Sequence, residues 1–274
     1  MKPVRFKYQA PATVAEAVQQ LAEAGIDGKA LAGGQSLVPM MNFRLARPAV
    51  LVDLNGIGEL SGIAVDGDHV KLGALTRHQT IADSERLQHA LPLLVEAAGL
   101  IGHWGIRTRG TIGGSIVHAD PSAEWPAVLT ALSAELELVG PQGAHRVPAG
   151  EFVLGPLTTA IGMDEILTRI HIPRLPGARA AIAEVARRPG DFALAGTVVV
   201  ASAADTRWTF FGLGGPPETV RLSADDVRDE ASLKRQLTDR VAALEVTGDM
   251  HGGADWRRQV AVVVALRAWR QVAA

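Results

Sequence analysis

The sequence predicts an α+β fold, because strand-like and helical segments are mixed along its 274 residues without a repeating unit. An opening unit of short strands and one helix is followed by a hairpin signal at Asp66-Gly67, which begins a strand-rich unit. The last third reads as a meander of strands followed by helices. These observations together predict sheets covered by helices.

The opening unit is predicted to hold one well-defined helix. Thr13 and Glu16 have the spacing of a capping box, apolar residues recur at helical spacing after them, and Gly25 ends the pattern. Three short apolar segments are expected to be strands, at residues 4–8, 29–32 and 50–54. The second of these strands leads directly into Gly33 and Gly34.

The middle of the chain continues with a hairpin of strands 63–65 and 69–72. Thr76 and Gln79 again have capping-box spacing, which predicts that a helix begins there. Further elements follow from periodicity and turn residues. They are helices at about 91–100 and 122–132 and strands at 135–139 and 165–172.

Residues 173–177 (PRLPG) are the best candidate for a linker, because two prolines and a glycine interrupt regular structure. We therefore expect one domain over residues 1–173, with subdomains of about 1–55 and 56–173, and a second domain over 174–274. In the second domain we expect strands at 180–186, 193–201 and 207–213, and helices near 223–238 and 255–272.

Composition excludes several classes of function. The 27 basic and 29 acidic residues give a formal charge of −2, so the basic excess expected of a nucleic-acid-binding protein is missing. The sequence has no cysteine, which excludes disulfides, a thiol nucleophile and iron–sulfur clusters held by this chain's own thiolates. Any such cluster must belong to another polypeptide.

The first residues lack the apolar core of a signal peptide, and the apolar run at residues 260–266 is too short to span a bilayer. We therefore expect a cytoplasmic protein with no membrane insertion.

Two glycine-rich segments point to a cofactor. Residues 32–36 read AGGQS directly after a predicted strand, and residues 111–115 read TIGGS. Paired glycines let a backbone turn sharply and approach a pyrophosphate closely. Neither segment fits the Rossmann or Walker pattern, so phosphates would be held in another way. For one such segment an ordinary structural turn is the more common explanation, whereas two in one chain favour a cofactor.

The longer stretches AGGQSLVPMMNFRLARP (32–48) and TIGGSIVHADPSAEWP (111–126) resemble the two FAD-binding signatures of the medium, flavoprotein subunits of the molybdenum hydroxylases, the family of carbon monoxide and xanthine dehydrogenases. The segments RRPGDFALAG (187–196) and GLGGPPETVR (212–221) resemble the C-terminal domain of the same subunits. Two departures are the divergence after Arg221 and the triplet Trp256-Arg257-Arg258, where such subunits often have a tyrosine–arginine pair.

The resemblance implies a two-subdomain FAD-binding fold of the vanillyl-alcohol-oxidase and molybdenum-hydroxylase flavoprotein type, with a C-terminal domain of sheet plus helices. It implies that the two glycine segments contact the FAD pyrophosphate and flavin through Ala32, Gly33, Gly34, Gln35, Ser36, Thr111, Ile112, Gly113, Gly114 and Ser115. Asp120 would accept a hydrogen bond from a ribityl hydroxyl, and Lys29 and Leu31 would approach from the preceding strand. Phe192 would cover the flavin ring or would be an ordinary core residue.

The function that the resemblance implies is electron transfer. FAD, bound without a covalent link, would pass electrons from [2Fe-2S] clusters on a small partner subunit to an external acceptor. Substrate would be oxidised at a molybdenum cofactor on a large partner subunit. The rivals are a stand-alone FAD oxidase of the same fold and a flavin-free assembly module.

No other chemistry is expected of this chain itself. His118, Asp120 and Glu124 could be drawn as a metal triad, but no supporting histidine motif is present, so Asp120 as a cap and Glu124 as a solvated side chain are the better interpretation. No residue pattern indicates a hydrolase, and we expect no catalytic side chain and no metal ligand.

Overall fold

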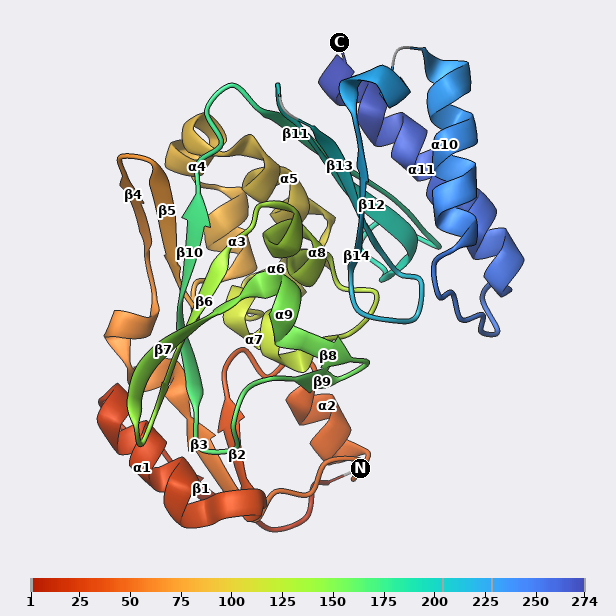
Figure 1. Ribbon diagram of the computed structural model, residues 1–274. Coiled ribbons are helices and arrows are strands. Elements are labelled where there is room, and N and C mark those ends of the chain that lie inside the picture. Colours follow the sequence, from red (N-terminus) through yellow and green to blue (C-terminus); the bar gives the residue numbers. More distant parts are fainter. Residues whose placement is uncertain (1, 204, 228, 274) are drawn as a thin grey trace.

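The computed structural model describes residues 2–203, 205–227 and 229–273 and confirms the α+β fold (Figure 1). Three main sheets succeed one another along the molecule. They are a parallel sheet with strand order β1-β3-β2, an antiparallel sheet β4-β5-β10-β6-β7 and an antiparallel meander β11-β12-β13-β14. A small ribbon of β8 (Val153–Gly155) and β9 (Thr158–Thr159) lies between the first and second units.

The opening unit contains β1 (Lys7–Gln9), α1 (Val14–Ala24), β2 (Gly28–Leu31), α2 (Leu37–Asn42) and β3 (Val50–Asp53). The capping box is confirmed, because the Thr13 hydroxyl accepts from the N–H of Glu16 at 3.2 Å and the Glu16 carboxylate accepts from the N–H of Ala12 at 2.8 Å. The first strand begins at Lys7, three residues later than its apolar residues suggested.

The second sheet is built from β4 (Ile63–Asp66), β5 (His69–Gly73), β6 (Glu135–Gly140), β7 (Gly143–Pro148) and β10 (Ile166–Pro173). The hairpin at Asp66-Gly67 is confirmed by the pairing of Asp66 with His69. β7 is an edge strand with mostly exposed side chains, so it carries no alternation of apolar residues that could have predicted it.

Seven short helices accompany this sheet. They are α3 (His78–Ala82), α4 (Glu85–Ala90), α5 (Pro92–Leu100), α6 (Trp104–Arg107), α7 (Ile112–His118), α8 (Glu124–Ala131) and α9 (Ala149–Phe152). The predicted capping box at Thr76 and Gln79 is wrong. α3 begins at His78, and the Thr76 hydroxyl instead bonds to the backbone of Gly62, donating to its carbonyl at 3.0 Å.

The C-terminal unit is a four-stranded meander of β11 (Arg179–Ala186), β12 (Ala193–Ala201), β13 (Thr206–Phe211) and β14 (Glu218–Leu222), followed by α10 (Glu230–Ala242) and α11 (Ala254–Ala273). The helix predicted from residue 223 begins later, because residues 224–227 form a 3-10 turn and Asp229 caps α10 by accepting from the N–H of Ser232 at 2.8 Å. Residue 228 lies outside the described residues.

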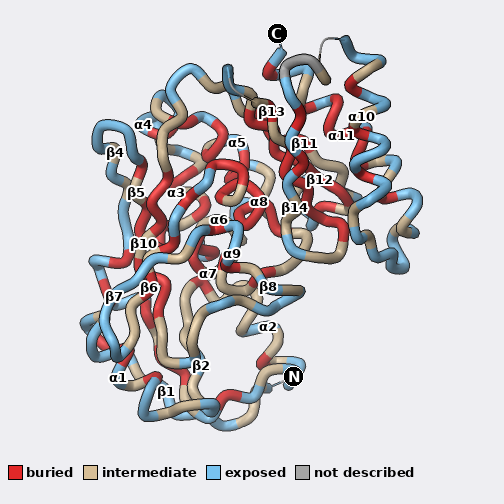
Figure 2. Tube along the Cα trace, in the orientation of Figure 1, coloured by how far each residue is buried: buried red, intermediate tan, exposed pale blue. Residues whose placement is uncertain are grey.

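The two faces of the C-terminal sheet have different partners. One face packs on α10 and α11, whereas Ile182, Val198 and Phe211 on the other join the core of the middle unit. Figure 2 shows this continuous buried region passing through α8 and β12. Residues 174–178 between β10 and β11 form a short connection, and the proposed domain boundary there stays a prediction. No helix in the described part of the chain is long and apolar enough to cross a bilayer.

Candidate functional site

The first glycine segment, residues 32–36, lies between the end of β2 and the start of α2. Gly33 is buried, and Gly34 has a positive φ of 72°, a conformation that glycine adopts without steric cost. The backbone N–H groups of Gly33, Gly34, Gln35 and Ser36 donate to no other described residue. Unpaired successive N–H groups in a turn suit an anion, so residues 33–36 are called the amide cradle below.

The second glycine segment differs from the turn that the sequence suggested. Thr111 caps α7 by accepting from the N–H of Gly114 at 3.1 Å, so Gly113 and Gly114 lie in the first turn of a helix. The N–H groups of Ile112, Gly113 and Ser115 also donate within the chain. The glycines of this segment therefore allow other groups to come close to its backbone, whereas the N–H groups free to bind an anion are those of the amide cradle.

The structure brings the two glycine segments together. A Cβ on Gly33 would lie 2.8 Å from the Cα of Gly110, and a Cβ on Gly114 would lie 3.6 Å from the Cβ of Ala32. Gly113 is equally constrained on its other side, since a Cβ there would lie 2.6 Å from the Cβ of Ala74. These glycines let the two segments pack closely on the protein around them, and the free amides of the cradle beside this contact suit the pyrophosphate of a dinucleotide.

The remaining predicted site residues differ in exposure and in hydrogen bonding. Lys29 is exposed and Leu31 half-buried on β2. Asp120 has one carboxylate oxygen that accepts from the N–H of Ser122 at 2.9 Å and a second that accepts from no described residue. The hydroxyls of Ser36 and Ser115 likewise have no described partner, so all three side chains can still bind a ligand.

Phe192 is not a core residue. Its side chain is 56% exposed in the loop between β11 and β12. In that loop Gly190 packs on the backbone of Gly102, where a Cβ would lie 2.5 Å from the Gly102 carbonyl oxygen. The loop thus approaches the segment before α6, and the placing of Phe192 against a flavin stays a prediction.

A polar connection that no sequence motif predicts joins the first glycine segment to the residues just before the second. The side-chain amide of Asn55 donates to the carbonyl of Ala32 at 2.8 Å and accepts from Arg77 at 2.6 Å. Arg77 also donates to the carbonyl of Arg109. These residues follow strands and belong to no recognisable motif, so only the tertiary structure shows that they meet.

Glu124 is not the solvated side chain that the sequence suggested. It is buried at the start of α8, and this burial, with a further contribution from the charge of Glu184, raises its pKa to about 8. Burial raises the pKa of Glu184 on β11 to about 7. The described residues contain no cluster that could hold a metal ion, and Asp120 caps no helix but holds the turn at Ser122.

His78 is a second buried titratable group close to the site. Its Nδ1 accepts from the indole N–H of Trp125 at 3.1 Å, and the two rings stack with centroids 6.1 Å apart. Burial, followed by the charges of Arg107 and Arg77, lowers its pKa to about 4. The imidazole is therefore neutral near pH 7 and acts as an acceptor in the core.

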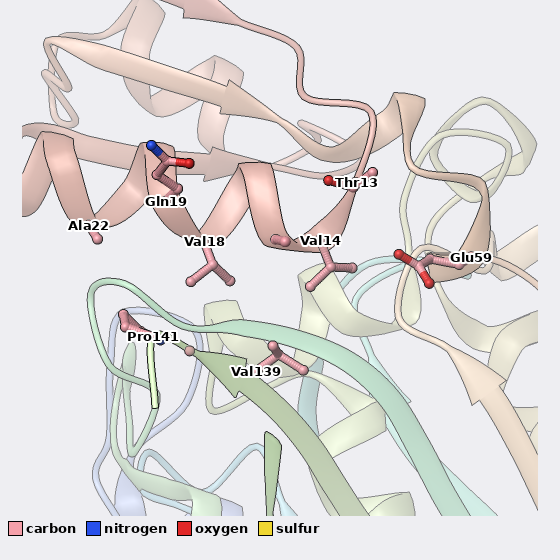
Figure 3. A pocket seen from close by; sticks show the side chains of 10 residues that line it. Thr13, Val14, Val18, Gln19, Ala22, Glu59, Val139 and Pro141 are labelled. Carbon is pink, nitrogen blue, oxygen red and sulfur yellow. The ribbon is translucent and has the colours of Figure 1, made fainter. Parts of the chain in front are cut away.

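A groove of about 690 Å³ lies elsewhere, between α1 and the turn joining β6 and β7 (Figure 3). Its walls are mostly apolar, with Val14 and Val18 facing Val139 and Pro141. None of the predicted FAD-binding residues lines it. Since it lacks a set of converging polar donors, it does not fit a dinucleotide and is not the functional site.

Comparison with known proteins identifies the family of the chain. Residues 4–175 match the family model described as the FAD binding domain in molybdopterin dehydrogenase. The chain is 37% identical to the 6-hydroxypseudooxynicotine dehydrogenase complex subunit alpha of Paenarthrobacter nicotinovorans, over 95% of this chain and 92% of that protein. It is 35% identical to the carbon monoxide dehydrogenase medium chain of Afipia carboxidovorans, over 98% and 96%. A solved carbon monoxide dehydrogenase from Hydrogenophaga pseudoflava superposes with a TM-score of 0.93 at 36% identity, covering 99% of this chain and 98% of that one.

Proposed function

This chain belongs to the family of FAD-binding medium subunits of the molybdenum hydroxylases, and we propose that it carries electrons from iron–sulfur clusters on a partner subunit to an external acceptor. The observation that supports this role most directly is the amide cradle at residues 33–36. Its backbone N–H groups have no acceptor among the described residues, and it lies next to the second glycine segment. As a member of this family, the chain is an oxidoreductase subunit.

The partners follow from what this chain lacks. Its sequence has no cysteine, so iron–sulfur clusters of the usual thiolate type must be held by another chain. The names of its relatives, a complex subunit alpha and a medium chain, are those of components of larger enzymes. We propose a small subunit with [2Fe-2S] clusters and a large subunit with a molybdenum cofactor.

FAD, when bound, supplies the chemistry of accepting and releasing electrons. The residues of this chain would bind and orient it. The cradle amides would donate to the pyrophosphate, the Ser36 and Ser115 hydroxyls would add polar contacts, and the free Asp120 oxygen would accept from a ribityl hydroxyl. Phe192 would limit the access of water to one part of the flavin.

FAD binding is tested by titrating the flavin-free chain with FAD and following flavin fluorescence. We expect one FAD per chain, released into the supernatant on acid precipitation because the link is not covalent. A well-folded chain that binds no FAD would establish the flavin-free assembly module instead. Yellow colour retained in the acid pellet would contradict non-covalent binding.

Electron transfer is tested by anaerobic absorbance spectroscopy. We expect the isolated holoprotein to be reduced by dithionite but not by aldehydes, aromatic heterocycles or carbon monoxide. The assembled complex should reduce its flavin when its own substrate is added. Substrate-dependent reduction of the isolated chain, free of molybdenum and iron, would favour the stand-alone oxidase. A cytoplasmic location is part of the same proposal, and fractionation of cells would test it.

A further inference from the structure

We propose that Asn55 and Arg77 are positioning residues for FAD, which hold the first glycine segment at a fixed distance and orientation from the second. This inference rests on the proposed FAD-binding function. It concerns two residues outside both glycine segments, and its basis is a continuous set of hydrogen bonds that joins the carbonyl of Ala32 to the carbonyl of Arg109.

The orientation of the Asn55 side chain is fixed by three neighbours. Its Nδ2 donates to Asp53 Oδ1 at 2.5 Å and to the Ala32 carbonyl at 2.8 Å, which uses both of its hydrogens. Its Oδ1 accepts from Arg77 at 2.6 Å. Rotating the amide by half a turn would place its oxygen against two other oxygens, so only one orientation satisfies all three contacts.

Asp53 is itself held in place. Its other carboxylate oxygen accepts from the hydroxyl of Tyr8 at 2.5 Å, and Oδ1 also accepts from the backbone N–H of Asn55 at 2.9 Å. Tyr8 lies on β1 and Asp53 ends β3, which are neighbours in the parallel sheet. The sheet thus provides a rigid support for the Asn55 amide.

The contact with Ala32 determines where the cradle amides point. In a trans peptide the carbonyl of Ala32 and the N–H of Gly33 point in opposite directions. Because Asn55 holds that carbonyl, the N–H of Gly33 must point away from Asn55, and it donates to no described residue. Asn55 therefore orients a donor that it does not touch.

Arg77 connects this support to the second glycine segment and to the residues just before it. Its backbone pairs with Thr111 in an isolated antiparallel bridge, and its guanidinium donates to the carbonyl of Arg109. That carbonyl is the one against which Gly33 packs. The Asn55–Arg77 pair therefore acts where the first glycine segment packs on the residues just before the second.

The charges beside the cradle suit the same ligand. Burial and the nearby charge of Arg109 lower the pKa of Arg77. Within the described residues Arg77 forms no ion pair, although Asp53 contributes a favourable charge at longer range. Two neighbouring cations are complementary to a pyrophosphate, which would relieve their mutual repulsion.

The test compares Asn55→Ala and Arg77→Lys with the wild-type chain. Lysine keeps the positive charge of Arg77 but cannot donate to two acceptors in the same geometry, so it separates the bridge from the charge. Gln88→Glu and Arg86→Lys, both on the exposed side of α4, are the matched controls. Each protein is freed of FAD and titrated with FAD, and the melting temperature of the flavin-free form is measured separately.

We expect the dissociation constant for FAD to rise about tenfold in Asn55→Ala and in Arg77→Lys, as for the loss of one or two hydrogen bonds. The melting temperature of the flavin-free form should change by less than about 2 °C, because the residues are exposed or half-buried. In the double variant the effects should be less than multiplicative, since both residues act through one bridge.

Unchanged FAD affinity in both variants, with a wild-type chain that binds FAD, would overturn this inference and leave the proposed function intact. Lower affinity that only follows a large fall in the melting temperature of the flavin-free form would also overturn it, because the bridge would then be purely structural. A wild-type chain that binds no FAD would overturn the proposed function and this inference together.

Discussion

Gly33 packs so closely on Arg109 that a Cβ added to Gly33 would overlap the carbonyl oxygen of Arg109, and it would also lie 2.8 Å from the Cα of Gly110. Both neighbours are backbone atoms that cannot rotate away. We therefore expect Gly33→Ala to destabilise the flavin-free chain by about 1–3 kcal/mol and to lower FAD affinity as a consequence. Thermal unfolding of the flavin-free protein measures the first effect.

Gly58→Ala is the matched control, because no atom lies within 4 Å of the Cβ that it would add. Its melting temperature should stay close to that of the wild type. Equal stability of Gly33→Ala and Gly58→Ala would show that Gly33 does not pack on the backbone of Arg109 and Gly110. Loss of FAD by Gly33→Ala alone is therefore not evidence of direct phosphate contact.

Glu124 should make stability depend on pH. Its pKa is 4.5 ordinarily and about 8 in the folded chain, so the folded state binds the proton more tightly. The resulting stability is present below about pH 4.5 and is lost as pH rises toward 8. We expect Glu124→Gln to have the higher melting temperature of the two proteins at pH 8–9, when the flavin-free forms are compared.

Glu151 on α9 is the control for Glu124, because its side chain is exposed to solvent. Glu151→Gln should follow the wild-type pH profile. Burial raises the pKa of Glu184 to about 7, so the melting temperature of Glu124→Gln should still depend partly on pH. Parallel profiles for wild type and Glu124→Gln would show that Glu124 is ionised and solvated in the folded chain.

His78 should give the opposite pH dependence. Its pKa falls from 6.5 to about 4 on folding, so the unfolded chain binds the proton more tightly and stability is lost as pH falls from about 6.5 toward 4. We expect His78→Phe to have a flatter profile in this window, with a lower melting temperature at pH 7 because Trp125 loses its acceptor. His89→Phe, at an exposed site, should keep the wild-type slope.

Arg257 should be essential for the C-terminal unit. Its side chain is only 4% exposed, donates to the carbonyls of Leu194 and Gly212 at 2.6 Å each, and pairs with Asp249 at 2.7 Å. A lysine cannot make these contacts together, so we expect Arg257→Lys to cost about 3 kcal/mol or more.

Its neighbour Arg258 is the control, because its ion pair with Asp255 is exposed on the carboxylate side and should contribute less than about 1 kcal/mol. Chemical denaturation of the two lysine variants makes the comparison. A fall in stability no larger for Arg257→Lys than for Arg258→Lys would contradict the role of Arg257.

The sequence by itself determined the elements whose signals are local. Thr13 and Glu16 predicted the start of α1, and Asp66-Gly67 predicted the hairpin of β4 and β5. The stretches that contain AGGQS and TIGGS predicted the family that the comparisons confirm. Capping bonds and tight turns depend on residues a few positions apart, so one stretch of sequence is enough to specify them.

Tertiary structure alone decided the rest. Thr76 has the spacing of a cap yet bonds to Gly62, Glu124 is buried on α8, which packs on β12 and β13, and Asn55 accepts a hydrogen bond from Arg77. In each case the decisive partner comes from another part of the chain. Burial, pKa shifts and hydrogen-bond partners depend on which distant segments pack together, and no local pattern of residues encodes that packing.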